Sequence, residues 1–147
     1  MRTVQYSIEV GQPRDVVYQF AVDPGRMASW VVNDDVRLSI ADEPLEVGST
    51  YTVHNGDGEN NRRTFIYEVV ALEPDTSMAI RSAGRLLTYT TRRSFAEESG
   101  KTTVSETIEM EDPPGMAKLL GGFMMGRVKK NHQQSLQRLK AILEQSE

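Results

Sequence analysis

Hydrophobic positions near the C-terminus recur at helical spacing. Between Pro114 and Glu147, apolar side chains return every three or four residues, with charged and amide side chains mostly between them. A straight helix of about 33 residues would span roughly 50 Å, which is longer than a domain of this size. Glycine weakens a helix, so we expect a bend or break at Gly121, Gly122 or Gly126 and a firm helix from about Gly122 onward.

Most of the preceding chain has the pattern of strands. Residues 3–10 alternate polar and apolar side chains, which is typical of a strand with one buried face. Pro13 opens a short helix, Asp23 and Pro24 end it, and a second helical piece runs from Met27 to Trp30. Six further strands are predicted at residues 36–41, 49–54, 63–72, 77–82, 86–95 and 102–111. The short turns between most of them favour an antiparallel sheet.

Composition limits the function classes. The 147 residues are 38% hydrophobic, which predicts a single domain, residues 1–147, with one core. The net charge of −4 with scattered basic residues excludes nucleic acid as a partner. The chain has no cysteine, and its two histidines form no metal-binding motif, so we expect neither a metal nor another cofactor. No segment is apolar enough for stable membrane insertion, and the N-terminus lacks a signal sequence, so we expect a cytoplasmic protein.

The order of elements and several short sequence segments resemble those of a known family. The segments are Ile8-Glu9-Val10, Pro13-Arg14-Asp15-Val16-Val17, Asp23-Pro24, Trp30, Val47-Gly48-Ser49 and Leu136-Gln137-Arg138-Leu139-Lys140. Together they resemble the START/Bet v 1-like (SRPBCC) superfamily, and within it the polyketide cyclase/dehydrase family. The resemblance implies an α+β helix-grip fold, in which a curved antiparallel sheet of seven strands wraps around a long C-terminal helix. It also implies two short helices between the first two strands and a hydrophobic cavity that takes sterols, lipids, quinones or polyketides.

An inward ion pair is predicted on two adjacent strands. Tyr89 and Arg93 share the apolar face of the strand at 86–95, and Glu106 shares the apolar face of the next strand. The short turn between the strands places Arg93 and Glu106 opposite or diagonal to each other. One interpretation is the polar end of a ligand pocket, where Arg93 holds a carboxylate or phenolate oxygen and Glu106 or Tyr89 exchanges a proton. The other is a structural salt bridge.

Other candidates lie on the helices and on a central strand. His132 lies one helical turn from Val128, which suits either a general base or a hydrogen-bonded boundary histidine. Trp30 is placed at the cavity entrance or in the core. The remaining candidate ligand-binding residues are Tyr67, Phe123, Met124 and Val128. Met125 lies off the predicted apolar stripe, which suggests a cavity mouth or a homodimer contact.

Three hypotheses follow for function. The first is binding, including transport, of a small hydrophobic or aromatic ligand such as a lipid, quinone or polyketide. The second is an enzyme of the cyclase or dehydrase type, in which Glu106 or His132 removes a proton α to a carbonyl and Arg93 stabilises the enolate. The third is a protein-interaction module with its contact surface around Met125.

Overall fold

The computed structural model describes residues 2–31, 36–41, 43–55, 64–84, 87–111, 115 and 121–145. Its elements, in chain order, are β1 (Arg2–Val10), α1 (Arg14–Val22), α2 (Pro24–Trp30), β2 (Val36–Ser39), β3 (Thr50–Asn55), β4 (Thr64–Glu73), β5 (Ser77–Gly84), β6 (Thr88–Glu98), β7 (Lys101–Met110) and α3 (Gly121–Gln145). This order of strands and helices is the predicted one.

The seven strands form one antiparallel sheet in the order β1-β7-β6-β5-β4-β3-β2. Strands β2 to β7 pair with their neighbours in sequence, as short hairpins require, and β1 joins the far edge by pairing with β7. Tight turns between strands use left-handed backbone at Asp75, Ser99 and Gly100. A register shift between Val69 and Ala71 marks a bulge, and bulges bend a sheet. The α+β helix-grip fold is therefore confirmed.

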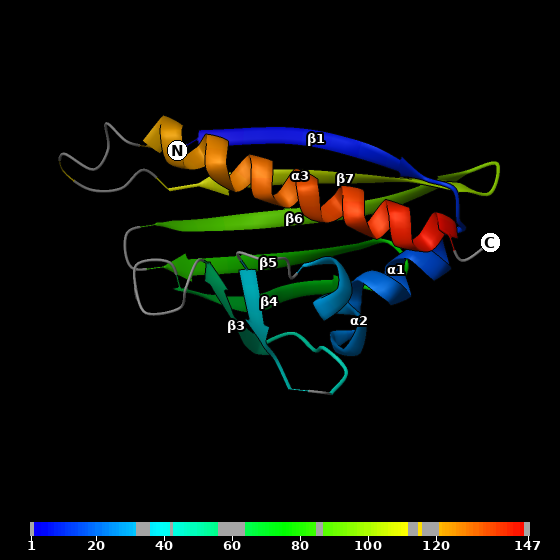
Figure 1. Cartoon of the computed structure of the whole chain (residues 1–147), viewed down its shortest axis with the longest axis horizontal. Coiled ribbons are helices and arrows are strands. Elements are labelled where there is room, and N and C mark those ends of the chain that lie inside the picture. Colours follow the sequence, from blue (N-terminus) through cyan, green and yellow to red (C-terminus); the bar gives the residue numbers. More distant parts are fainter. Residues whose placement is uncertain are drawn as a thin grey trace.

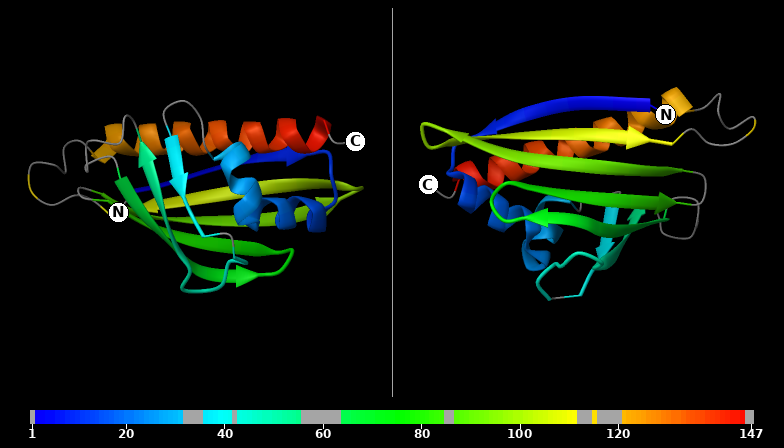
Figure 2. Two further views of the ribbon diagram at one scale, coloured as in Figure 1. Left: turned by 60° about the horizontal axis from the view of Figure 1, so that its bottom comes forward. Right: turned by 180° about the vertical axis from the view of Figure 1, so that it is seen from behind.

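All three helices lie on one face of the sheet. In Figure 1, α3 crosses in front of the strands, and α1 and α2 lie beside its C-terminal half. Seen from behind in Figure 2, the opposite face of the sheet is covered by none of the helices that the structure describes. The burial of side chains along β6 agrees with this arrangement. The side chains that face the helices are buried, namely Tyr89, Thr91, Arg93 and Phe95. Arg92, between them, is exposed on the outer face and pairs with Glu109.

The helix α3 begins at Gly121 and continues through Gly122 and Gly126 to Gln145. Its 25 residues give a length of about 37 Å, which suits the sheet that it crosses. The expected firm helix from about Gly122 is confirmed. Of the three glycines offered for a bend or break, Gly126 does not interrupt the helix, which continues through it. Residues 116–120, which the apolar spacing assigned to the same helical segment, lie outside the described residues.

The buried stripe of α3 differs from the predicted one at its N-terminal end. Phe123 is 67% exposed, whereas Met125 is 4% exposed and packs with Tyr89, Ile108 and Met110. A step of three residues back from Val128 reaches Met125 and a step of four reaches Met124, and both steps are compatible with helical spacing. The sheet selects Met125, and Phe123, five residues before Val128, lies on the exposed side of the helix. The prediction for these two side chains was wrong, and Met125 is too buried to provide the suggested cavity-mouth or homodimer surface.

Two core clusters flank the centre of the covered face. One joins α1, β6, β7 and the end of α3 through residues such as Val17, Phe95 and Leu139. The other joins Met27 of α2 to β3 and β5. The Asp23 side chain caps α2 by accepting a hydrogen bond of 3.0 Å from the Gly25 backbone N–H. In the described ranges, no helix is long and apolar enough to cross a membrane.

Two glycine substitutions should change stability in opposite directions. Gly126→Ala should raise the free energy of unfolding by about 1 kcal/mol, because alanine favours the helix and a Cβ there meets nothing within 4 Å. Gly84→Ala should lower it, because the new Cβ would lie 2.6 Å from the Phe65 ring. Urea unfolding of both variants checks the signs; a stabilised Gly84→Ala would contradict the packing described here.

Candidate functional site

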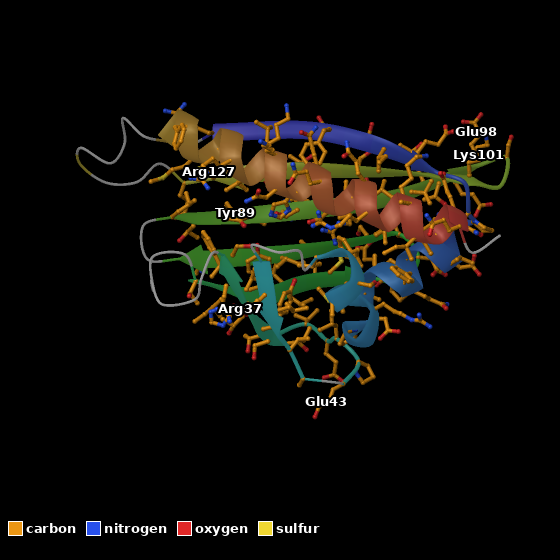
Figure 3. All side chains as sticks on the ribbon, viewed as in Figure 1. Arg37, Glu43, Tyr89, Glu98, Lys101 and Arg127 are labelled. Atoms are coloured by element: carbon orange, nitrogen blue, oxygen red, sulfur yellow. The ribbon has the colours of Figure 1, made fainter. Side chains whose placement is uncertain are left out.

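A pocket lies between the covered face of the sheet, α2 and the middle of α3. Its volume is ≈ 80 Å³, and it opens partly to solvent. At about 10–15 Å³ for each water, this volume holds about five to eight water molecules, which suits a ligand the size of one ring. Figure 3 shows one of its residues, Tyr89, on β6 near α3. The pocket walls come from β3 to β6 and from both helices.

Aromatic side chains form most of the sheet side of the pocket. Tyr51 and Tyr67 lie on adjacent strands with ring centroids 5.2 Å apart, and Phe65 meets Tyr89 edge-on at 5.7 Å. Between Tyr67 on β4 and Tyr89 on β6, the paired residue of β5 is the small Ser82. Because Ser82 takes little room, the two tyrosine side chains reach each other across a whole strand.

A chain of three polar groups runs across the pocket. The hydroxyl groups of Tyr67 and Tyr89 are 2.8 Å apart, and the Tyr89 hydroxyl lies 3.3 Å from Nε2 of His132 on α3. Burial raises the pKa of both tyrosines above the ordinary value. Burial lowers the pKa of His132 below 6.5, although the charge of Glu106 acts in the opposite direction. At neutral pH all three groups are therefore uncharged.

The predicted inward ion pair is confirmed. Arg93 and Glu106 are directly opposite in the β6–β7 register, and Nη2 of Arg93 lies 2.6 Å from Oε2 of Glu106. The second carboxylate oxygen accepts a hydrogen bond of 2.5 Å from the Tyr6 hydroxyl. Burial works to lower the pKa of Arg93, but the Glu106 carboxylate outweighs it and keeps the pKa above its ordinary value. The guanidinium also lies 5.3 Å over the Trp30 ring.

The pair has one member at the pocket and one behind it. Arg93 lines the pocket, whereas Glu106 is completely buried and is not among the lining residues. Both Glu106 oxygens accept hydrogen bonds from protein side chains. Glu106 therefore holds Arg93 and Tyr6 in place and does not reach a ligand in this arrangement, which differs from its predicted place among the ligand-binding residues.

Sequence reasoning missed a polar group of residues on α3. Asn131, Ser135 and Arg138 line the pocket beside His132, although Arg138 was predicted to lie on the solvated face of the helix and the other two were not considered. Arg138 donates through Nε to the Trp30 carbonyl at 2.9 Å and through Nη2 to the Ser135 hydroxyl at 3.1 Å. Their spacing of four and three residues is itself a helical stripe, and this signal was available next to His132.

The structure brings together six of the nine predicted ligand-binding residues. Those lining the pocket are Trp30, Tyr67, Tyr89, Arg93, Val128 and His132. Met124 is half-buried and packs against the cluster of Met125 and Ile108 instead. Phe123 faces solvent, because it lies on the opposite side of α3 from the buried stripe. No group of metal-binding side chains occurs among the residues for which positions are described.

The comparisons with known proteins agree with this architecture. A family model described as polyketide cyclase / dehydrase and lipid transport matches residues 1–144. A comparison with curated proteins gave no match.

Similar solved structures share the fold at low identity. Ara h 8.0201 has a TM-score of 0.79 and 13% identity over 98% of each chain. The Aha1 dimer from Colwellia psychrerythraea has a TM-score of 0.71 and 18% identity, covering 98% of this chain and 97% of that one. DynU16, a putative protein in the dynemicin biosynthetic locus, has a TM-score of 0.71 and 23% identity. The match covers 99% of this chain but only 48% of DynU16, so this chain spans about half the length of that protein. The family-model match over nearly the whole length, together with the fold, shows that this chain belongs to the polyketide cyclase/dehydrase and lipid transport family.

Proposed function

We propose that this protein binds a small aromatic or otherwise hydrophobic ligand in the pocket between the sheet, α2 and α3. The observation that carries the proposal is an aromatic-lined pocket whose wall residues Trp30 and Thr91 each have a buried polar atom, Nε1 and Oγ1, without a hydrogen-bond partner in the described part of the chain. Buried polar atoms are ordinarily paired, so such atoms in a pocket wall mark places for ligand or water contacts. A cytoplasmic location stays a prediction of the sequence.

The size of the pocket narrows the ligand. Ligand pockets commonly measure about 300–1,000 Å³, and this pocket is much smaller. A single aromatic ring fits better than a long lipid chain or a multi-ring polyketide. Burial of about 100 Å² of apolar ligand surface would contribute about 2.5 kcal/mol, so the polar contacts at the ends of the pocket must supply much of the affinity and the orientation.

The pocket-filling substitution Val128→Phe tests binding. Val128 lines the pocket on α3, and the larger ring should occupy ligand space and reduce the affinity for one-ring aromatics about tenfold or more. Trp30 is the only tryptophan and lies in the pocket wall, so its fluorescence reports binding directly. Ile66→Phe is the matched control, because Ile66 is 56% exposed on β4. Equal affinities for Val128→Phe and the unmodified protein would place the binding site elsewhere.

A second candidate function is proton abstraction from carbon next to a carbonyl group. It is supported by His132, an uncharged imidazole at the pocket that is hydrogen-bonded to Tyr89. Because both Glu106 oxygens are occupied, His132 is the better base of the two that the sequence suggested. Tyr89, held by Tyr67, would then donate a hydrogen bond to the carbonyl or enolate oxygen.

Hydrogen–deuterium exchange at the methyl group of acetophenone tests this second function. Wild-type protein should accelerate exchange above the buffer rate, His132→Ala should remove the acceleration, and Tyr89→Phe should reduce it about tenfold. The base form of His132 predominates above its lowered pKa, so the rate should fall as pH drops through a midpoint below 6.5. Proton NMR measures the loss of the methyl signal. Exchange that persists in His132→Ala would exclude His132 as the base.

A further inference from the structure

The charges around the pocket do not balance. Two arginines, Arg93 and Arg138, line it, and no aspartate or glutamate does so among the described residues. Glu106 neutralises Arg93 from behind. For Arg138, the described part of the chain provides no carboxylate within ion-pair distance, and its hydrogen bonds go to the neutral Trp30 carbonyl and the Ser135 hydroxyl. One positive charge therefore remains uncompensated at the pocket.

Arg138 has the geometry to bind an anion. Its two hydrogen bonds use Nε and one N–H of Nη2, and a guanidinium has five N–H donors, so three remain for solvent or a ligand. The bond to the Trp30 carbonyl, together with the contact to Ser135, fixes the guanidinium in place, which reduces the entropy lost on binding. Partial burial lowers the pKa of Arg138, yet arginine stays charged in proteins. Partial loss of hydration makes an anionic partner more favourable there than in water.

The wall of the pocket also holds an unpaired hydrogen-bond donor. The indole Nε1–H of Trp30 can only donate, and it is buried without a partner among the described residues. The Arg93 guanidinium lies beside it, over the same indole ring. A ligand rich in acceptor oxygens fits this wall, whereas an ammonium group would meet two guanidinium groups.

We propose that the pocket selects small aromatic carboxylates over neutral and cationic compounds of the same shape, with the carboxylate bound by Arg138 and the ring directed towards Trp30 and Tyr89. This inference rests on the proposed binding function and deepens it by naming the ligand class. The net charge of −4 repels anions at long range, so the preference must come from the pocket itself. A pocket with room for about one ring sets the upper size.

The test compares 4-methylbenzoate with its neutral isostere 4-methylbenzamide and with the cationic 4-methylbenzylamine. Titration calorimetry and Trp30 fluorescence should give an affinity for the benzoate about tenfold higher than for the benzamide, as expected for one charge-assisted hydrogen-bonded contact. The benzylamine should bind most weakly. Added salt should reduce the preference for the benzoate, because the contact lies at the partly open side of the pocket.

Variants on α3 assign the preference to one residue. Arg138→Gln should lower the benzoate affinity much more than the benzamide affinity, so that the two become similar, and Arg138→Lys should retain part of the preference. Arg127→Gln is the matched control, because it removes the same charge from the same helix (Figure 3) but Arg127 is exposed and outside the pocket. It should leave both affinities unchanged.

Several results would overturn the proposal. Equal or tighter binding of the benzamide by the unmodified protein would exclude selection for anions, although the binding function would stand because the ring still binds. If neither compound nor any other one-ring aromatic binds, the proposed function itself fails. If Arg138→Gln weakens both ligands equally, Arg138 acts only by holding Trp30 and α2, and the assignment of anion binding to Arg138 is wrong.

Discussion

The buried pair of Arg93 and Glu106 is the interaction on which the site depends. Two charges removed from water are tolerated only when they are paired and hydrogen-bonded. Here the Glu106 carboxylate is paired with Arg93, and its other oxygen accepts a hydrogen bond from the Tyr6 hydroxyl. Loss of one partner of such a pair typically costs about 3–5 kcal/mol, because the other is left buried and charged. The pair therefore locks the register of β6 against β7 and holds Arg93 under Trp30. The other residues of the pocket lie around Arg93 and Trp30.

Polarity in the pocket is arranged in three different ways. Deep in the sheet, charge is present but balanced, at Arg93 and Glu106. At one side, the Tyr67–Tyr89–His132 chain is polar but uncharged, because burial shifts the pKa values away from the charged forms. On α3, Arg138 is charged without a carboxylate partner in the described ranges. In the two proposals, the anion contact is made by Arg138 and the proton is taken by His132, while Tyr89 serves both.

The sheet and the Arg93–Glu106 ion pair could be predicted from the sequence, but the side chains that α3 turns towards the sheet and the pocket could not. Strand alternation has a period of two, so Tyr89, Arg93 and Glu106 could be assigned to the inner face. Helical spacing leaves a choice between steps of three and four, which is why Met124 was preferred to Met125 as the buried neighbour of Val128. Arg138 was missed because a charged side chain in a helix is ordinarily solvated, although its spacing from Ser135 and Asn131 continues the stripe beside His132. The hydrogen bond from Arg138 to the Trp30 carbonyl of α2 shows that it faces the pocket. The position of Glu106 behind Arg93 could not be predicted, because it depends on the hydrogen bond from Tyr6, which lies a hundred residues away in the sequence.

The central claim is that this pocket binds an aromatic ligand against Trp30. Trp30 is the only tryptophan, so its indole N–H should give the single indole signal in the NMR spectrum, and this signal reports on the pocket wall. On titration with 4-methylbenzoate, the account predicts a saturable shift of this signal, whereas the backbone amide signal of exposed Arg127 stays in place. An indole signal that does not move at any ligand concentration, in protein that remains folded, would contradict the account.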